Sequence, residues 1–124
     1  MTKRAVLIID DDPIHVEVTR RLLEMTCGAI VSAAPNGTSA RVHIDRQSFD
    51  LLVLDLNMPD YDGIEFLRHL REIGYSGAIV IASGADRSLR QAADRLGKAY
   101  GLNVAGVVEK PISLQNLVPA MAHL

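Results

Sequence analysis

The chain has 124 residues, a formal net charge of −2, 48% apolar residues and 23% charged residues, a composition ordinary for a globular protein. This length predicts a single domain over residues 1–124 with one well-filled core. The charge gives no electrostatic footprint for nucleic acid or an anionic membrane surface, and the single cysteine, Cys27, excludes an internal disulfide and a multi-cysteine zinc site.

The first apolar run covers residues 5–9 and predicts a strand. Five apolar residues between Arg4 and Asp10 are too few for a signal peptide, and no run of the chain is long enough to cross a bilayer. We therefore predict a cytoplasmic location and no membrane partner.

A helix is predicted directly after this strand. Asp12 followed by Pro13 indicates its start, because Asp is a preferred N-cap and proline suits the first turn. Gly28 can close it. Its apolar residues recur at helical spacing on one face, which we expect at Ile14, Val18, Leu22 and Met25.

The next two segments are shorter. A weaker strand over 30–34 leads to an Asn-Gly turn at 36–37. A short helix over 38–46 then places Ala40 and Ile44 on one side.

The middle of the chain carries the strongest strand signal. Four apolar residues in a row, 51–54, predict a strand buried on both faces, as in a parallel sheet. Asp55 ends this run, and Pro59 and Gly63 indicate a turn. Further strands are predicted over 78–82 and 104–108.

Three helices follow these strands. Gly74 stops the first, Asp86 and Gly101 bound the second, and Ser113 caps the third. In the helix 63–73 we expect the apolar residues to face inward; they are Ile64, Phe66, Leu67, Leu70 and Ile73. The helix 86–100 carries Leu89, Ala92, Ala93, Leu96 and Tyr100. The last helix carries Leu114, Leu117, Val118 and Met121.

Five strand–helix units predict an α/β fold, a five-stranded parallel sheet with helices on both faces. Right-handed crossovers leave few topologies, and the flavodoxin-like strand order 2-1-3-4-5 is the commonest for this length. In that order the first and third strands are neighbours. Asp10, Asp11 and Asp55 would then meet at the carboxyl edge of the sheet.

Three neighbouring carboxylates repel one another, and a bound hard divalent cation such as Mg²⁺ would offset this repulsion. Helix capping and strand ending are the alternative explanation for such residues, and capping is the interpretation that we favour for Asp12. For Asp10, Asp11 and Asp55 together we favour a magnesium site.

Two further residues are predicted at the same edge. Ser83 follows the fourth strand and Lys110 follows the fifth. A carboxylate such as Asp55 can attack phosphorus to form an acyl phosphate, and the transferring group needs positive charge and hydrogen-bond donors on its oxygens. Lysine supplies the charge and a serine hydroxyl supplies a donor. The combination of Asp55, Ser83 and Lys110 therefore favours a phosphoryl-transfer site. The alternative is that Ser83 and Lys110 are loop residues without a shared function.

These residues resemble the response-regulator receiver domain of two-component signalling over essentially the whole chain. The motifs that carry the resemblance are Ile8-Ile9-Asp10-Asp11-Asp12-Pro13, Leu54-Asp55-Leu56-Asn57-Met58-Pro59, Asp62-Gly63, Ala82-Ser83-Gly84 and Glu109-Lys110-Pro111.

The resemblance implies a role for each site residue. Asp55 would accept a phosphoryl group, with Ser83 and Lys110 engaging its oxygens. Asp11 and Asp55 would bind Mg²⁺ directly together with the carbonyl of Asn57, while Asp10 would act mainly through water. The peptide bond between Lys110 and Pro111 would be cis, and Gly84 would leave the site open.

The resemblance also implies partners. The phosphoryl donor would be a sensor histidine kinase or a phosphotransfer protein, and the receiver of the signal would be a downstream output domain or protein. The switched surface would comprise the helix 86–100, the strand 104–108 and the last helix, where a second subunit could also dock to form a homodimer. Such a domain catalyses only its own phosphorylation and dephosphorylation, so we do not expect an enzyme.

Three features depart from the family pattern. Val107 stands where receivers usually carry a Tyr or Phe that reports phosphorylation, so we expect the signal to move the helix 86–100 as a body. The segment between Ser83 and Lys110 is longer than usual, and part of it resembles receivers joined to cyclic-dinucleotide phosphodiesterase domains. Pro119 lies in the last predicted helix, where it favours a kink or a late start.

Two other classes of protein are alternative interpretations of these residues. A phosphohydrolase of the haloacid-dehalogenase type needs an acid/base Asp two residues after the nucleophile, where this chain has Asn57. A phosphorylation-independent interaction module would not need the complete acidic and basic set. Nucleotide-binding Gly-rich fingerprints are absent, and the four histidines lack metal-ligand spacing, so we expect them at the surface or at interfaces.

Overall fold

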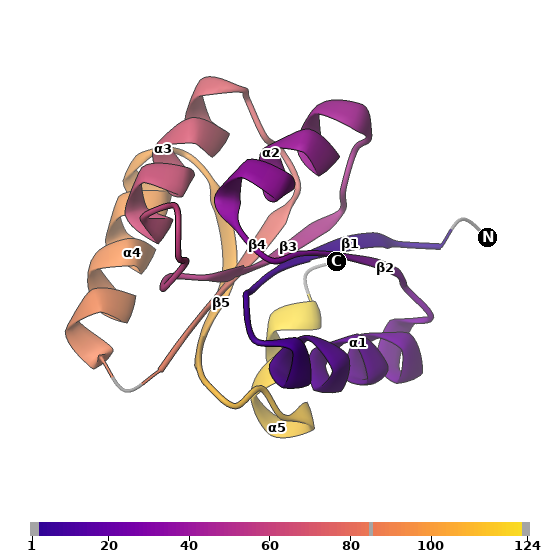
Figure 1. Cartoon of the computed structure of the whole chain (residues 1–124). Helices are drawn as coiled ribbons and strands as arrows, with labels where there is room; N and C mark the ends of the chain where they lie inside the picture. The colour runs from indigo at the N-terminus through magenta and orange to yellow at the C-terminus, as the bar shows by residue number, and fades with distance from the viewer. Residues whose placement is uncertain (1–2, 85, 123–124) are drawn as a thin grey trace.

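The computed structural model describes residues 3–84 and 86–122. Strands and helices alternate along the whole described chain (Figure 1). The strands are β1 (Ala5–Ile9), β2 (Ile30–Ala34), β3 (Leu51–Asp55), β4 (Ala78–Ser83) and β5 (Asn103–Glu109). The helices are α1 (Pro13–Cys27), α2 (Gly37–Arg46), α3 (Gly63–Glu72), α4 (Arg87–Ala99) and α5 (Leu114–Met121).

All five strands pair in parallel, in the order β2-β1-β3-β4-β5. The predicted flavodoxin-like topology is therefore confirmed. The central β3 is buried along its full length, as expected for a strand covered on both faces. Its neighbours hold it in a register that places Ile9 beside Leu54 and Asp55 beside Ala82, so the ends of β1, β3 and β4 lie together.

Helices cover both faces of the sheet, with α2, α3 and α4 on one side and α1 and α5 on the other (Figure 1). Phe66, Leu67 and Leu70 of α3 are fully buried in the first layer. Leu23 of α1 and Leu117 of α5 are fully buried in the second. Successive side chains along each strand point to opposite faces and pack into both layers, so the sheet is apolar on both faces.

Polar side chains define where the helices begin. Asp12, Asp62, Asp86 and Ser113 accept hydrogen bonds from the first turns of α1, α3, α4 and α5. Asn36 does the same for α2, so the predicted Asn-Gly turn is in fact an N-cap followed by the first helical residue, Gly37. Both arrangements use the same polar side chain, because Asn stabilises turns and helix starts alike.

The apolar face predicted for α1 is not the face that packs against the sheet. Ile14 and Met25 are each 76% exposed and Val18 is 43% exposed, whereas only Leu22 of the predicted set packs against the core. The buried residues are His15, Thr19 and Leu23, one position further along the helix. The periodicity of α1 was predicted correctly, but its rotation was not, because two of the three buried residues are polar.

Three smaller expectations also differ. Ile73, expected inward, is 43% exposed because α3 ends at Glu72 and Ile73 is its C-cap. Pro119 lies inside α5, which begins directly after its Ser113 cap, so the helix has no late start. β5 is one residue longer at each end than predicted. Within the described residues, no helix combines the length and apolar composition needed to cross a bilayer.

Candidate functional site

Residues from four strand ends meet at the carboxyl edge of the sheet. Asp10 directly follows β1, Asp55 is the last residue of β3, and Lys110 directly follows β5. Ser83 is the last residue of β4 rather than the first residue after it. One ligand atom each from Asp10, Asp11 and Asp55 lies within 4.8 Å of the other two. The structure thus brings together the residues that the sequence places at this edge.

Lys110 is the cation of the site. Its Nζ donates to Asp55 Oδ2 at 2.8 Å and lies 2.9 Å from Asp10 Oδ2. Burial lowers the pKa of Lys110, but the hydrogen bonds and charges of the two carboxylates outweigh this and raise it. The lysine is therefore held as a cation directly beside the carboxylate of Asp55.

The pKa values of the two buried carboxylates shift in opposite directions, because their hydrogen bonds offset burial to different extents. Burial raises the pKa of each. At Asp10, hydrogen bonds from His15, from the backbone N–H two residues on and from Lys110 outweigh burial and lower the pKa to about 2. At Asp55, burial prevails over its hydrogen bonds and raises the pKa, and the charge of Asp10 adds to the rise.

Ser83 is buried at the same edge of the sheet. The side chain is fully buried, and its Oγ has no hydrogen-bond partner among the described residues. A buried hydroxyl without a partner is unfavourable, and at this edge of the sheet the Oγ is available to donate to a bound group. Next to it, a Cβ built on Gly84 would meet no atom within 4 Å, so this side of the site is open. The Lys110–Pro111 peptide bond is cis.

Asn57 lies in the loop after β3 and is exposed. Its backbone N–H donates to Asp55 Oδ1 at 2.9 Å, so Asp55 has one donor on each oxygen. A groove of about 480 Å³ opens beside this loop. The residues that line it are Asp11, Leu56, Asn57, Met58, Pro59, Tyr61, Asp62 and Leu89.

Sequence reasoning missed how the loop after β3 is held. Asp60 accepts from the backbone N–H of Gly37 at 2.9 Å and from Thr38 Oγ1 at 2.8 Å, at the start of α2. The ring of Tyr61 packs edge-on to Phe66 with its centroid 5.5 Å away, and the guanidinium of Arg41 lies over it. These contacts fix the loop that follows Asp55.

His15 was also missed, and the expectation that the histidines are surface or interface residues is wrong for it. Its Nδ1 lies 2.6 Å from Asp10 Oδ2, and its Nε2 accepts from the backbone N–H of Ile112 at 3.3 Å. The side chain is 7% exposed. The sequence signal for it is a histidine in the first turn of the helix that follows Asp10, but this signal becomes informative only once the rotation of α1 is known.

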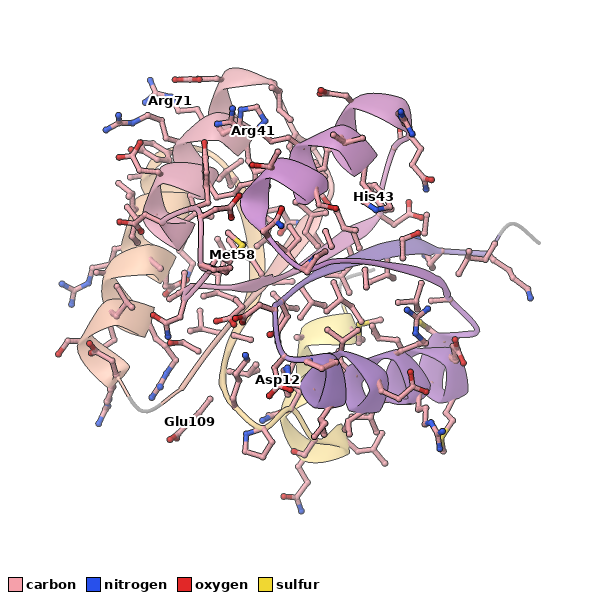
Figure 2. The ribbon with its side chains drawn as sticks, in the orientation of Figure 1. Asp12, Arg41, His43, Met58, Arg71 and Glu109 are labelled. Carbon is pink, nitrogen blue, oxygen red and sulfur yellow. The ribbon has the colours of Figure 1, made fainter. Side chains whose placement is uncertain are left out.

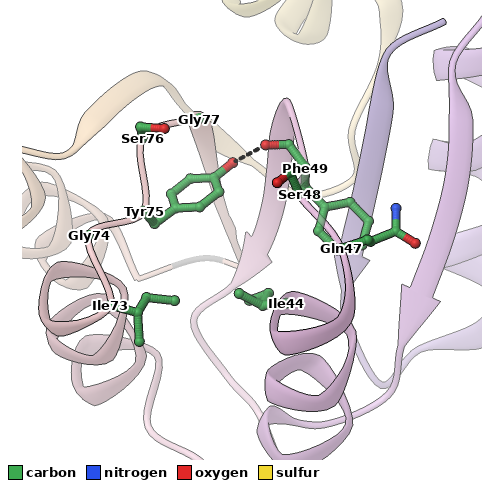
Figure 3. Close-up of a pocket in the computed structure, with 9 residues that line it drawn as sticks. All are labelled: Ile44, Gln47, Ser48, Phe49, Ile73, Gly74, Tyr75, Ser76 and Gly77. Atoms are coloured by element: carbon green, nitrogen blue, oxygen red, sulfur yellow. Dashed lines mark hydrogen bonds between the residues drawn. The ribbon is translucent and has the colours of Figure 1, made fainter.

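Figure 2 shows Asp12 at the start of α1 and Glu109 at the end of β5. A second cavity, of about 200 Å³, lies at the opposite, amino edge of the sheet (Figure 3). Its lining residues are Ile44, Gln47, Ser48, Phe49, Ile73, Gly74, Tyr75, Ser76 and Gly77. None of these side chains is charged, so this cavity does not suit phosphoryl chemistry.

The strand order and the acidic cluster at the β1/β3 switch point define a flavodoxin-like α/β domain with a candidate divalent-metal and phosphoryl site. Residues 6–122 match the model of the response regulator receiver domain family, and the chain belongs to this family. This confirms the resemblance seen in the sequence.

Individual relatives agree with this assignment. "Two-component response regulator ARR22" of Arabidopsis thaliana is 38% identical, over 96% of this chain and 82% of that protein. "Cyclic di-GMP phosphodiesterase RocR" of Pseudomonas aeruginosa is 32% identical over 95% of this chain, which spans only 30% of that protein. A solved response regulator receiver domain (CheY-like) from Methylobacillus flagellatus superposes with a TM-score of 0.83 at 26% identity, covering 98% of both chains.

Proposed function

We propose that this chain is a magnesium-dependent phosphoacceptor in which Asp55 takes a phosphoryl group from the phosphohistidine of a sensor kinase or phosphotransfer protein. The observation that carries the proposal is the arrangement around Asp55. A lysine Nζ lies 2.8 Å from its Oδ2, and Ser83 Oγ at the end of the adjacent β4 is buried with no hydrogen-bond partner in the described part of the chain. Together they supply the charge and the donor that a transferring phosphoryl group needs.

In the proposed transfer, a carboxylate oxygen of Asp55 attacks phosphorus. A P–O bond forms, the P–N bond to the donor imidazole breaks, and the imidazole leaves with the electron pair of that bond. Lys110 shifts its contact from the carboxylate to a phosphoryl oxygen, and Ser83 Oγ donates to another. Both residues thereby stabilise charge that the attack moves onto the phosphoryl group.

The residues present fit a magnesium ion. Asp11 and Asp55 with the carbonyl of Asn57 would hold it directly, and Asp10 would hold it through water. A magnesium ion held there would supply positive charge that stabilises the negative charge of the site. The closeness of three carboxylates supports this assignment, because a divalent cation relieves their mutual repulsion.

We infer that the chemistry stays within the chain itself, so that the protein is not a phosphatase for other substrates. Asn57 stands where a haloacid-dehalogenase-type enzyme needs a proton-donating Asp, and its backbone N–H donates to Asp55. We place the exchange in the cytoplasm, where response regulators work.

The output is proposed to leave through α4, β5 and α5, toward a downstream domain, a partner protein or a second copy of the chain. Val107 is half-buried against the α4 side of the core and is too small to act as a rotating aromatic switch. Arg90 of α4 instead binds the carbonyl of Gly84 and lies 3.9 Å from Glu109 of β5. A movement of Ser83 toward the phosphoryl group would therefore pull on α4 through Arg90.

The proposal is tested by intact-mass measurement after incubation with magnesium and phosphoramidate. The wild-type chain should gain one phosphoryl group that hydroxylamine removes, and Asp55→Asn should gain none. Asp45→Asn, a matched change at an exposed position of α2, should behave as wild type. A stable adduct on Asp55→Asn, or no adduct on the wild type, contradicts the proposal.

A further inference from the structure

The imidazole of His15 joins two parts of the site that are distant in the sequence. Its Nδ1 lies 2.6 Å from Asp10 Oδ2, and its Nε2 lies 3.3 Å from the backbone nitrogen of Ile112. A backbone N–H can only donate, so Nε2 must be the unprotonated acceptor. The proton of the neutral ring therefore lies on Nδ1, where it is donated to Asp10.

Both contacts lead to Lys110. Asp10 Oδ2, which binds His15, also lies 2.9 Å from Lys110 Nζ. Ile112, whose N–H the ring accepts, is two residues after Lys110 in the segment that carries the lysine from β5 to α5. The backbone N–H of Lys110 in turn donates to the carbonyl of Ser83 at 2.7 Å. His15 is thus the side chain that ties the acidic half of the site to the segment bearing the lysine.

We propose that His15 is a positioning residue for phosphoryl transfer, which orients the Asp10 carboxylate toward the metal position and holds Lys110 at a fixed distance from it. This inference rests on the proposed function. Without the imidazole, the buried Asp10 loses a donor, and among the described residues its carboxylate keeps only the contacts from Lys110 and from the backbone N–H of Asp12. This loss weakens the site for a divalent cation, because groups that orient metal-binding carboxylates govern metal affinity.

Three substitutions separate the two contacts. In His15→Asn, the amide nitrogen takes the position of Nδ1 and can still donate to Asp10, but the side chain is too short to reach Ile112. In His15→Gln, the amide oxygen reaches the position of Nε2 and can accept from Ile112, but the donation to Asp10 is lost. His15→Leu removes both contacts at similar volume.

The first measurement is the dissociation constant for Mg²⁺, by calorimetric titration of each intact variant. His15→Leu should bind magnesium about 10- to 100-fold more weakly than wild type. His15→Asn should recover most of this loss, and His15→Gln should stay close to His15→Leu. At saturating Mg²⁺, His15→Asn should still be phosphorylated by phosphoramidate more slowly than wild type, because the segment bearing Lys110 has lost its anchor.

Two matched controls address general loosening of the fold. Thr19→Val is a nearly isosteric change one turn along the same buried face of α1, at a hydroxyl that makes no hydrogen bond among the described residues. His43→Leu makes the same chemical change on α2, which covers the opposite face of the sheet (Figure 2). Both should keep wild-type magnesium affinity.

The second measurement is independent of metal and of phosphorylation. Long-range ¹H–¹⁵N spectra of the wild-type histidine rings should show the His15 proton on Nδ1, and a neutral ring protonated on Nε2 overturns the proposal. So does wild-type affinity in His15→Leu, affinity in His15→Asn as weak as in His15→Leu, or an equal loss in Thr19→Val. A wild-type chain that binds no magnesium contradicts the proposed function and the role of His15 together, whereas normal wild-type binding with an unaffected His15→Leu contradicts the role of His15 alone.

Discussion

The two edges of the sheet bury different kinds of side chain. The carboxyl edge buries Asp10 and Asp55, each 4% exposed, with Lys110 bound to both. The amino edge instead packs Phe49 and Tyr75 around a small cavity, where the Tyr75 hydroxyl donates to backbone carbonyls (Figure 3). Parallel strands bring their ends together at both edges, yet charge is buried at only the carboxyl edge of the described sheet.

This contrast separates stability from function. Burying a charge is unfavourable unless it is paired and hydrogen-bonded, so the carboxyl edge depends on each of its few donors. The amino edge gains stability from apolar burial, which needs no specific partner. Changes at the amino edge should therefore affect unfolding alone, whereas changes at the carboxyl edge should affect phosphorylation as well.

The largest effect on stability is expected at the amino edge. Phe49 is 6% exposed and packs into the core, so Phe49→Ala should lower the free energy of unfolding by about 3–5 kcal/mol. Urea titration measures this loss. The folded fraction should still be phosphorylated at the wild-type rate, and Gln47→Ala at an exposed neighbouring position should change neither quantity. If folded Phe49→Ala were phosphorylated more slowly than wild type, the expectation that the amino edge affects stability alone would be wrong.

A matched pair of glycines sharpens the comparison. A Cβ on Gly63 would lie 2.7 Å from Leu56 Cα, and a Cβ on Gly77 would lie 2.6 Å from the carbonyl oxygen of Phe49. Both Gly63→Ala and Gly77→Ala should therefore destabilise the fold by about 1–3 kcal/mol, because backbone must shift.

Only Gly63→Ala should also slow phosphorylation, since Gly63 packs against the residue that follows Asp55. Melting curves and phosphoramidate kinetics on both variants test this. Gly84→Ala, where a Cβ meets no atom within 4 Å, is the steric control and should keep wild-type stability. Equal slowing in both crowded variants would mean that the edges are coupled.

A further predicted effect, within the range expected for the glycine variants, is the pH dependence that comes from Asp10. Its pKa in the folded chain is about 2, below the ordinary value of 3.8, so the ionised carboxylate stabilises the fold by about 2 kcal/mol at neutral pH. This contribution is complete above the unfolded-state pKa and is lost as the pH falls through about 4 toward 2.

Urea midpoints measured between pH 2 and pH 6 should thus decline on the acid side with a slope that Asp10→Asn reduces. Asp55 works in the opposite direction, because its raised pKa means that protonation favours the folded state. Asp45→Asn, at an exposed position, should retain the wild-type slope. An unchanged slope in Asp10→Asn would show that Asp10 is not the stabilised carboxylate.

Much of this architecture could be predicted from local sequence. The bounds of β1 and β2 match the predicted strands, and β3 extends one residue beyond its predicted run to include Asp55. Asp12, Asp86 and Ser113 cap helices as expected, because strand burial and helix capping depend on neighbouring residues. The meeting of Asp10 with Asp55 followed from the predicted strand order. That order rests on the handedness of crossovers, a general rule of chain geometry.

The rotation of α1 was decided by tertiary contacts alone. Its apolar residues Ile14 and Met25 face outward, while His15 and Thr19 are buried. Most buried polar side chains are hydrogen-bonded, and the partners of His15 are Asp10, directly after β1, and Ile112, 97 residues away in the segment before α5. Such pairing has no local signature, because it depends on where distant strands end.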